Sequence, residues 1–85
     1  MNRLEKRFRG ACAERGVNCI TFQFCSPFRV ETLTEGLKPG WPHRQYFSCD
    51  AAVTPDHAYT PEGNEQRLLE ALVKRLDEIY TAGRA

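Results

Sequence analysis

The stretch that decides the fold is Val17-Asn18-Cys19-Ile20-Thr21-Phe22-Gln23-Phe24-Cys25, because its side chains alternate between two faces as in a half-buried strand. Ile20, Phe22 and Phe24 share one face, and Cys19, Thr21, Gln23 and Cys25 share the other. Ser26-Pro27 ends this strand, residues 17–25, because proline has no amide hydrogen to donate to a ladder. We expect the even-numbered face to be buried and the other face to meet solvent.

Two more strands are predicted downstream. Residues 28–34 alternate again, and their inward side chains are Phe28, Val30 and Thr32. Residues 44–53 form the third strand, whose inward side chains are Phe47, Cys49, Ala51 and Val53. The loop between them contains Pro39-Gly40, which fits the central positions of a type II turn. Three successive strands with short links predict an antiparallel meander.

Helices are predicted on both sides of the strands. Residues 3–15 follow the N-cap residue Asn2 and repeat apolar side chains at helical spacing. Residues 61–82 begin at a proline and carry a broad apolar stripe of Leu68, Leu69, Leu72, Val73, Leu76, Ile79 and Tyr80. Residues 1–85 are therefore predicted to form a single two-layer α+β domain of order α-β-β-β-α. Both helices cover one face of a three-stranded antiparallel sheet.

Length and hydropathy exclude several classes of protein. The chain has 85 residues, and none of its apolar runs approaches the roughly 20 residues that a membrane span needs. The polar start, residues 1–7, predicts no signal peptide. We therefore expect a cytoplasmic protein without membrane contact, whose four cysteines are free thiols.

The sequence predicts neither an enzyme nor a cofactor site. It contains no nucleophile elbow, no phosphate-binding glycine loop and no paired-carboxylate motif. A zinc or thiol site is an alternative, with ligands drawn from Cys19, Cys25, Cys49 and either His43 or His57. No Cys-x-x-Cys spacing is present, so we interpret the cysteines as packing residues and predict no metal site.

The N-terminal half is basic. Residues 1–49 hold eight Lys and Arg against four Asp and Glu, within a chain whose net charge is +1. Arg3, Lys6, Arg7 and Arg9 form a stripe on the first predicted helix. Such a stripe can follow a phosphate backbone, which makes nucleic-acid binding one alternative function, and a solvated helix face is the other interpretation.

The predicted order α-β-β-β-α resembles that of double-stranded-RNA-binding domains. Pro42-His43, followed by Phe47 and Val53, is similar to the stretch leading into that family's second strand. The family carries a lysine cluster at the start of its last helix, where this chain has Glu62-Gly63-Asn64-Glu65-Gln66. The acidic residues would repel phosphates, so no binding residue is transferred from the resemblance.

The loop before the third strand contains Trp41, the only tryptophan. An exposed Trp near Arg and Tyr is typical of protein interfaces, and a Trp that folds back to cap the core is the other interpretation. The predicted partner-binding residues are Gln23, Arg29, Trp41, Arg44 and Tyr46. We therefore predict a non-catalytic protein-interaction module that acts as an inhibitor or regulator, of the kind that phages direct at host machinery, and docks on a larger partner. A homodimer through the last helix is an alternative assembly.

Overall fold

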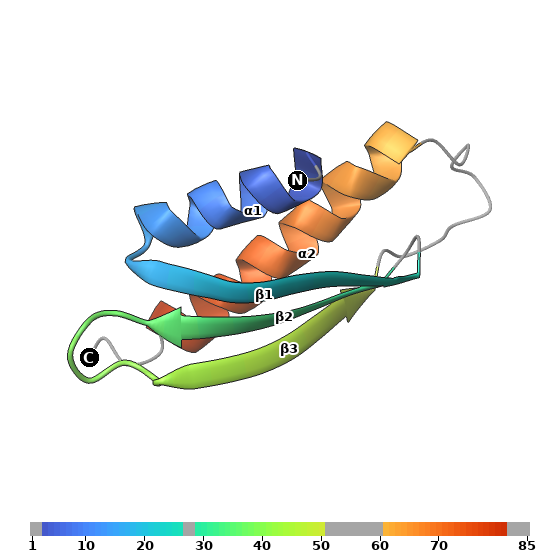
Figure 1. The fold of residues 1–85 in the computed structure, drawn as a ribbon. Helices are drawn as coiled ribbons and strands as arrows, with labels where there is room; N and C mark the ends of the chain where they lie inside the picture. The colour runs from blue at the N-terminus through green and yellow to red at the C-terminus, as the bar shows by residue number, and fades with distance from the viewer. Residues whose placement is uncertain (1–2, 27–28, 51–60, 82–85) are drawn as a thin grey trace.

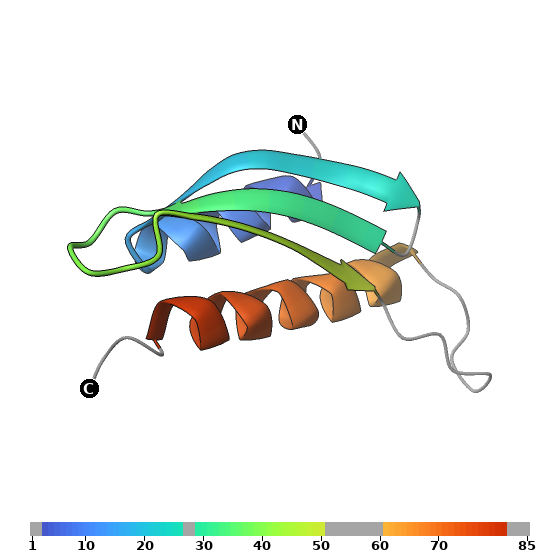
Figure 2. The ribbon, with the colours of Figure 1, turned by 90° about the horizontal axis from the view of Figure 1, so that it is seen from below.

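The computed structural model describes residues 3–26, 29–50 and 61–81. Its elements are α1 (Arg3–Glu14), β1 (Val17–Ser26), β2 (Arg29–Gly36), β3 (Arg44–Asp50) and α2 (Pro61–Thr81). The strands form one antiparallel sheet of order β1-β2-β3. Both helices lie on the same side of the sheet (Figure 1), which Figure 2 shows in a second view. The predicted fold class and element order are confirmed.

The element ends differ slightly from the prediction. α1 ends at Glu14, because Gly16 adopts a φ of 74° and turns the chain into β1. β2 continues to Gly36, because Glu35 and Gly36 still pair with β1. The predicted strand residues 51–53, together with Phe28 and Ala82, lie outside the described residues.

The core lies between the sheet and the two helices. Phe8 of α1 is fully buried, and its ring centroid lies 5.6 Å from that of Phe22 and 6.5 Å from that of Phe47. Leu4 and Cys12 complete the buried face of α1, as the helical spacing predicts. α2 buries one continuous stripe of Leu68, Leu72, Leu76 and Tyr80. These side chains, with Val17, Cys19 and Val30, form one apolar cluster.

β1 carries a bulge that the alternation did not predict. Cys19 pairs with Thr34 and Thr21 pairs with Leu33, so Ile20 is the extra residue between them. Val17 and Cys19 are buried before the bulge, and Phe22 packs against the core after it. The prediction that Cys19 faces solvent is therefore wrong, and so is the uniform inward face that included Ile20. Both errors have the same cause: the extra residue at the bulge switches the buried side chains of β1 from odd-numbered to even-numbered positions.

The loop between β2 and β3 contains the predicted turn. Gly40 has a φ of 85°, and the amide of Trp41 donates to the carbonyl of Lys38 at 3.2 Å. A positive φ at the third position of this four-residue turn is the mark of type II, so the prediction from Pro39-Gly40 is confirmed. The turn places Trp41 beside the end of the sheet.

Candidate functional site

One face of the sheet is covered by neither helix. Its side chains alternate with the buried residues Val30, Thr32 and Thr34 of β2 and with Phe47 of β3. We call it the open face, and it consists of Thr21, Gln23, Cys25, Arg29, Glu31, Leu33, Arg44, Tyr46, Ser48 and Asp50. The prediction that this side of the sheet stays uncovered holds for the described residues.

The open face has an acidic centre at Glu31. By strand register, Glu31 lies between Gln23 of β1 and Ser48 of β3. Hydrogen bonding from the Cys25 thiol and then from the Tyr46 hydroxyl lowers the pKa of the Glu31 carboxyl. The same carboxylate raises the pKa of Tyr46. Glu31 therefore stays ionised and orients two neighbouring side chains.

Arg29 ties this centre to the end of β3. Its Nη1 lies 3.1 Å from Oδ2 of Asp50, and its Nη2 donates to Oγ of Ser48 at 3.0 Å. Its Nε also lies 3.9 Å from Oε1 of Glu31. The guanidinium is thus held in one orientation by groups from two strands. A charged side chain fixed in advance loses less conformational entropy when a partner binds it.

Tyr46 is the prominent aromatic of the open face. It is 62% exposed, and it lies opposite Leu33 in the register of β2 and β3. Arg44 is also exposed and lies on the same face at the start of β3. Gln23, Arg29, Arg44 and Tyr46, four of the five predicted partner-binding residues, are therefore brought to one surface.

Trp41, the fifth predicted residue, lies elsewhere. Its ring centroid is 5.4 Å from that of Tyr80 on α2, and it packs against the core cluster. The Trp41 ring also makes a cation–π contact, because Nζ of Lys38 lies 4.8 Å from its centroid. The geometry corresponds to the alternative in which Trp41 folds back and caps the end of the core.

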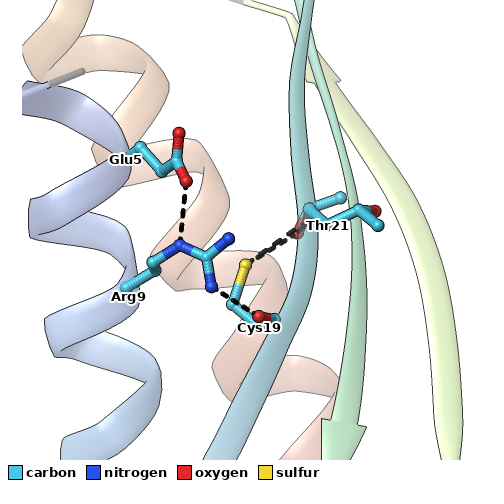
Figure 3. Close-up of polar contacts among 5 residues, drawn as sticks. Glu5, Arg9, Cys19 and Thr21 are labelled. Carbon is cyan, nitrogen blue, oxygen red and sulfur yellow. Dashed lines mark hydrogen bonds and ion pairs between the residues drawn. The ribbon is translucent and has the colours of Figure 1, made fainter. Parts of the chain in front are cut away.

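The basic stripe of α1 is largely neutralised within the molecule. Nε of Arg3 and Nη1 of Arg7 lie 3.4 and 3.3 Å from Oε1 of Glu65. Arg9 donates from Nε to Oε2 of Glu5 at 2.9 Å and from Nη1 to the carbonyl of Cys19 at 2.6 Å (Figure 3). The hydrogen bond to Glu5 raises the pKa of Arg9. Of the predicted nucleic-acid-binding residues, only exposed Lys6 has no ion pair among the described residues.

Two of the four free thiols lie together in the core. Cys12 and Cys19 are both buried, and Sγ of Cys19 lies 3.4 Å from the carbonyl of Thr21 and 3.5 Å from Oγ1 of Thr32. Hydrogen bonding from Cys12 lowers the pKa of Cys19, and Thr32 and Arg9 act in the same direction. Sequence reasoning missed this pair, because strict alternation places Cys19 on the open face.

The described residues of the alternative zinc site, Cys19, Cys25, Cys49 and His43, do not converge. Among residues 3–26, 29–50 and 61–81, no three His, Cys, Asp or Glu side chains are grouped so that they could hold a metal ion. His57 lies outside the described residues. An open groove does run along α2, where Gln66, Leu69, Val73 and Asp77 line it. It contains no cysteine, serine or histidine.

No described helix combines the length and the hydropathy needed to cross a bilayer. No family model, curated protein or solved structure matches the chain. The resemblance of the element order to double-stranded-RNA-binding domains is therefore not supported by any matching family model or protein.

Proposed function

We propose that this chain is a small non-catalytic protein-interaction module of the inhibitor or regulator type, which docks on a larger protein through its open face. The observation that carries the proposal is that the open face is exposed. Neither helix covers it, and Tyr46 stands 62% exposed within it. An aromatic side chain held away from the core contributes little to folding and is available to a partner.

The composition of the open face fits a protein partner. Tyr and Arg are enriched among the residues that dominate binding energy, and Tyr46 and Arg29 provide both. Tyr46 and Leu33 form an apolar pair, and the ionised groups of Arg29, Glu31 and Asp50 lie on one side of it. A partner with an apolar patch and peripheral charges of both signs would complement this arrangement.

Nucleic-acid binding through α1 has weaker support. Arg3, Arg7 and Arg9 each have a carboxylate partner within the chain. A phosphate backbone would have to displace Glu65 and Glu5 from these cations, which reduces the gain from each new contact. Overall charge near neutrality also differs from the strongly basic footprint of nucleic-acid binders.

Affinity capture from the native host, followed by binding measurements with the purified partner, tests the proposal. Tyr46→Ala should leave the melting temperature nearly unchanged and weaken binding by about tenfold or more, the effect expected of an interface anchor. Lys74→Ala provides the control, because Lys74 is an exposed residue of α2, which covers the other face of the sheet.

Two outcomes would contradict the proposal. The first is a captured protein whose affinity is the same for Tyr46→Ala, Arg29→Ala and the unchanged chain. The second is capture of nucleic acid that weakens steeply with salt and is lost when Arg3, Lys6 and Arg7 are reversed in charge. The second result would establish the α1 alternative instead.

A further inference from the structure

β3 forms one edge of the sheet and pairs with β2 alone among the described strands. Its seven pairs with β2, from Arg44 with Glu35 to Asp50 with Arg29, run without a register shift. In Figure 1, α2 runs behind the sheet and no other helix or strand passes beyond β3. Figure 2, seen from the β3 side, shows no described helix or strand next to the outer side of this edge. Among the described residues, the edge is therefore regular and without a second strand partner.

Two hydrogen bonds show which backbone groups of β2 face β3. The amide of Leu37 donates toward β1, to the carbonyl of Gly16 at 3.1 Å, whereas that of Gly36 donates toward β3, to the carbonyl of Pro42 at 3.3 Å. Backbone groups alternate between the two sides of a strand, so Thr34 and its even-numbered neighbours in β2 also face β3. Oγ1 of Thr34 donates to the carbonyl of Gln45 at 3.2 Å, which agrees with a Gln45 carbonyl that points toward β2.

The outward groups of β3 follow from the same alternation. Gln45, Phe47 and Cys49 direct their amides and carbonyls at β2, because they pair with Thr34, Thr32 and Val30. Arg44, Tyr46, Ser48 and Asp50 therefore direct theirs away from the sheet. An edge with regularly spaced free donors and acceptors is a template for another strand.

We infer that a second copy of this chain pairs with β3 in antiparallel orientation, about a two-fold axis at Phe47, to give a continuous six-stranded sheet. This register places Arg44 opposite Asp50 of the second copy, and Tyr46 opposite its Ser48. All four outward residues of each copy then exchange backbone hydrogen bonds. A shift of two residues in either direction leaves either Arg44 or Asp50 without such a partner within β3.

Charge complementarity selects the second copy as the occupant. Arg44 and Asp50 stand at opposite ends of β3, both exposed and both on the open face. The two-fold axis brings them together twice, once on each side of Phe47. Arg44 has no ion pair among the described residues, whereas Asp50 is bound by Arg29 at 3.1 Å and is still 63% exposed. Asp50 can thus accept a second guanidinium, and cross-strand pairs of opposite charge favour this register.

The pairing is independent of the proposed function. It uses the backbone edge of β3 and the end residues Arg44 and Asp50, whereas docking on the open face is assigned to Tyr46 and Arg29. If the chain is monomeric, docking through Tyr46 and Arg29 is unaffected. If Tyr46→Ala leaves partner binding unchanged, the β3 edge can still pair.

Sedimentation equilibrium of the full chain over a range of concentrations tests the inference. The unchanged chain should approach twice its monomer mass, and Arg44→Asp should raise the dissociation constant by about tenfold or more, because it places like charges opposite each other twice. Combining Arg44→Asp with Asp50→Arg should restore the dimer. Lys74→Glu, an equal charge reversal on α2, should leave it unchanged. Circular dichroism of each variant shows whether it is folded.

A covalent trap tests the register directly. Gln45 and Cys49 of the two copies lie opposite each other in the proposed pairing, at the close, non-hydrogen-bonded positions where a disulfide fits. Gln45→Cys in a Cys25→Ser background should form two disulfides per dimer with oxidised glutathione as oxidant, which is reduced to two thiols for each bond formed. A monomer at all concentrations would overturn the inference, as would a dimer that Arg44→Asp does not weaken and that is not trapped.

Discussion

The hydroxyl oxygen of Tyr80 lies 2.7 Å from Oγ1 of Thr34 and joins the end of α2 to the central strand. Thr34 donates its own proton to the carbonyl of Gln45 at 3.2 Å, so the proton between the two hydroxyls belongs to Tyr80. Both residues are at most 1% exposed. This hydrogen bond fixes the position of the Tyr80 ring, against which Trp41 packs.

A double-mutant cycle should show that this contact is cooperative. Thr34→Val leaves the buried Tyr80 hydroxyl without its acceptor and should lower the free energy of unfolding by about 1–3 kcal/mol. Tyr80→Phe should cost about 0.5–1.5 kcal/mol, because the Thr34 hydroxyl keeps its bond to Gln45. The double variant should cost less than the two single costs together, as measured by urea denaturation. Additive costs would show that the two hydroxyls do not interact.

The same tyrosine predicts a loss of stability in alkali. Burial raises the pKa of Tyr80 above its ordinary value of 10.0, so the folded state favours the protonated phenol. The resulting contribution is complete below pH 10 and falls as the pH rises through the folded pKa. Tyr80→Phe should therefore flatten the fall in stability above pH 10. Equal alkaline curves for Tyr80→Phe and the unchanged chain would contradict this assignment.

Two glycines should respond in opposite directions to alanine. A Cβ on Gly36 would lie 2.7 Å from the carbonyl of Pro42 and 2.8 Å from Cε1 of Tyr80. Gly36→Ala should therefore destabilise the fold by about 1–3 kcal/mol through overpacking. A Cβ on Gly10 meets nothing within 4 Å, and Gly10 lies inside α1. Gly10→Ala should stabilise it by about 0.5–1 kcal/mol. Thermal melts check both signs.

Much of the fold could be predicted, because it depends on local patterns. Leu68, Leu72 and Leu76 repeat at helical spacing, and that spacing alone identifies the buried side of α2. The bulge at Ile20 could not be predicted in this way. It depends on which residues of β2 lie opposite Cys19 and Thr21, which is a property of two strands together.

In the candidate site, too, local patterns could be predicted and contacts between distant segments could not. Alternation placed Gln23, Arg29 and Tyr46 on one surface, because the parity of a regular strand decides the face. The position of Trp41 depends on Tyr80, which is far away in sequence. Similarly, the basic stripe of α1 is paired with Glu65 of α2, which is also far away in sequence. Contacts between distant segments are not encoded in local periodicity.

Trp41 should contribute to folding rather than to docking. Trp41→Ala removes the ring that packs against Tyr80 and should destabilise the chain by about 1–3 kcal/mol, in proportion to the apolar surface lost. Partner affinity should stay within a factor of about two when it is measured well below the melting temperature, since neutral positions change binding little. A tenfold loss of affinity in a fully folded Trp41→Ala variant would place the loop in the interface.

Cys12 should control the ionisation of Cys19. Cys12→Ala removes the thiol that lowers the pKa of Cys19, so the pKa of Cys19 should rise toward its ordinary value. Thiolate absorbance followed against pH, in a Cys25→Ser, Cys49→Ser background, gives the pKa directly. Adding Cys19→Ser to that background identifies the signal, which should then be lost. An unchanged midpoint in Cys12→Ala would mean that Cys12 does not contact the Cys19 sulfur.

The bulged strand β1 also determines how large an assembly can become. The ladder of β1 is interrupted between Cys19 and Thr21 and again between Phe24 and Ser26. Such irregularities twist an outer strand and prevent a further chain from adding in register. When two copies join through β3, both outer strands of the combined sheet are β1. In the proposed dimer, the irregular β1 edges would therefore oppose the addition of a third copy.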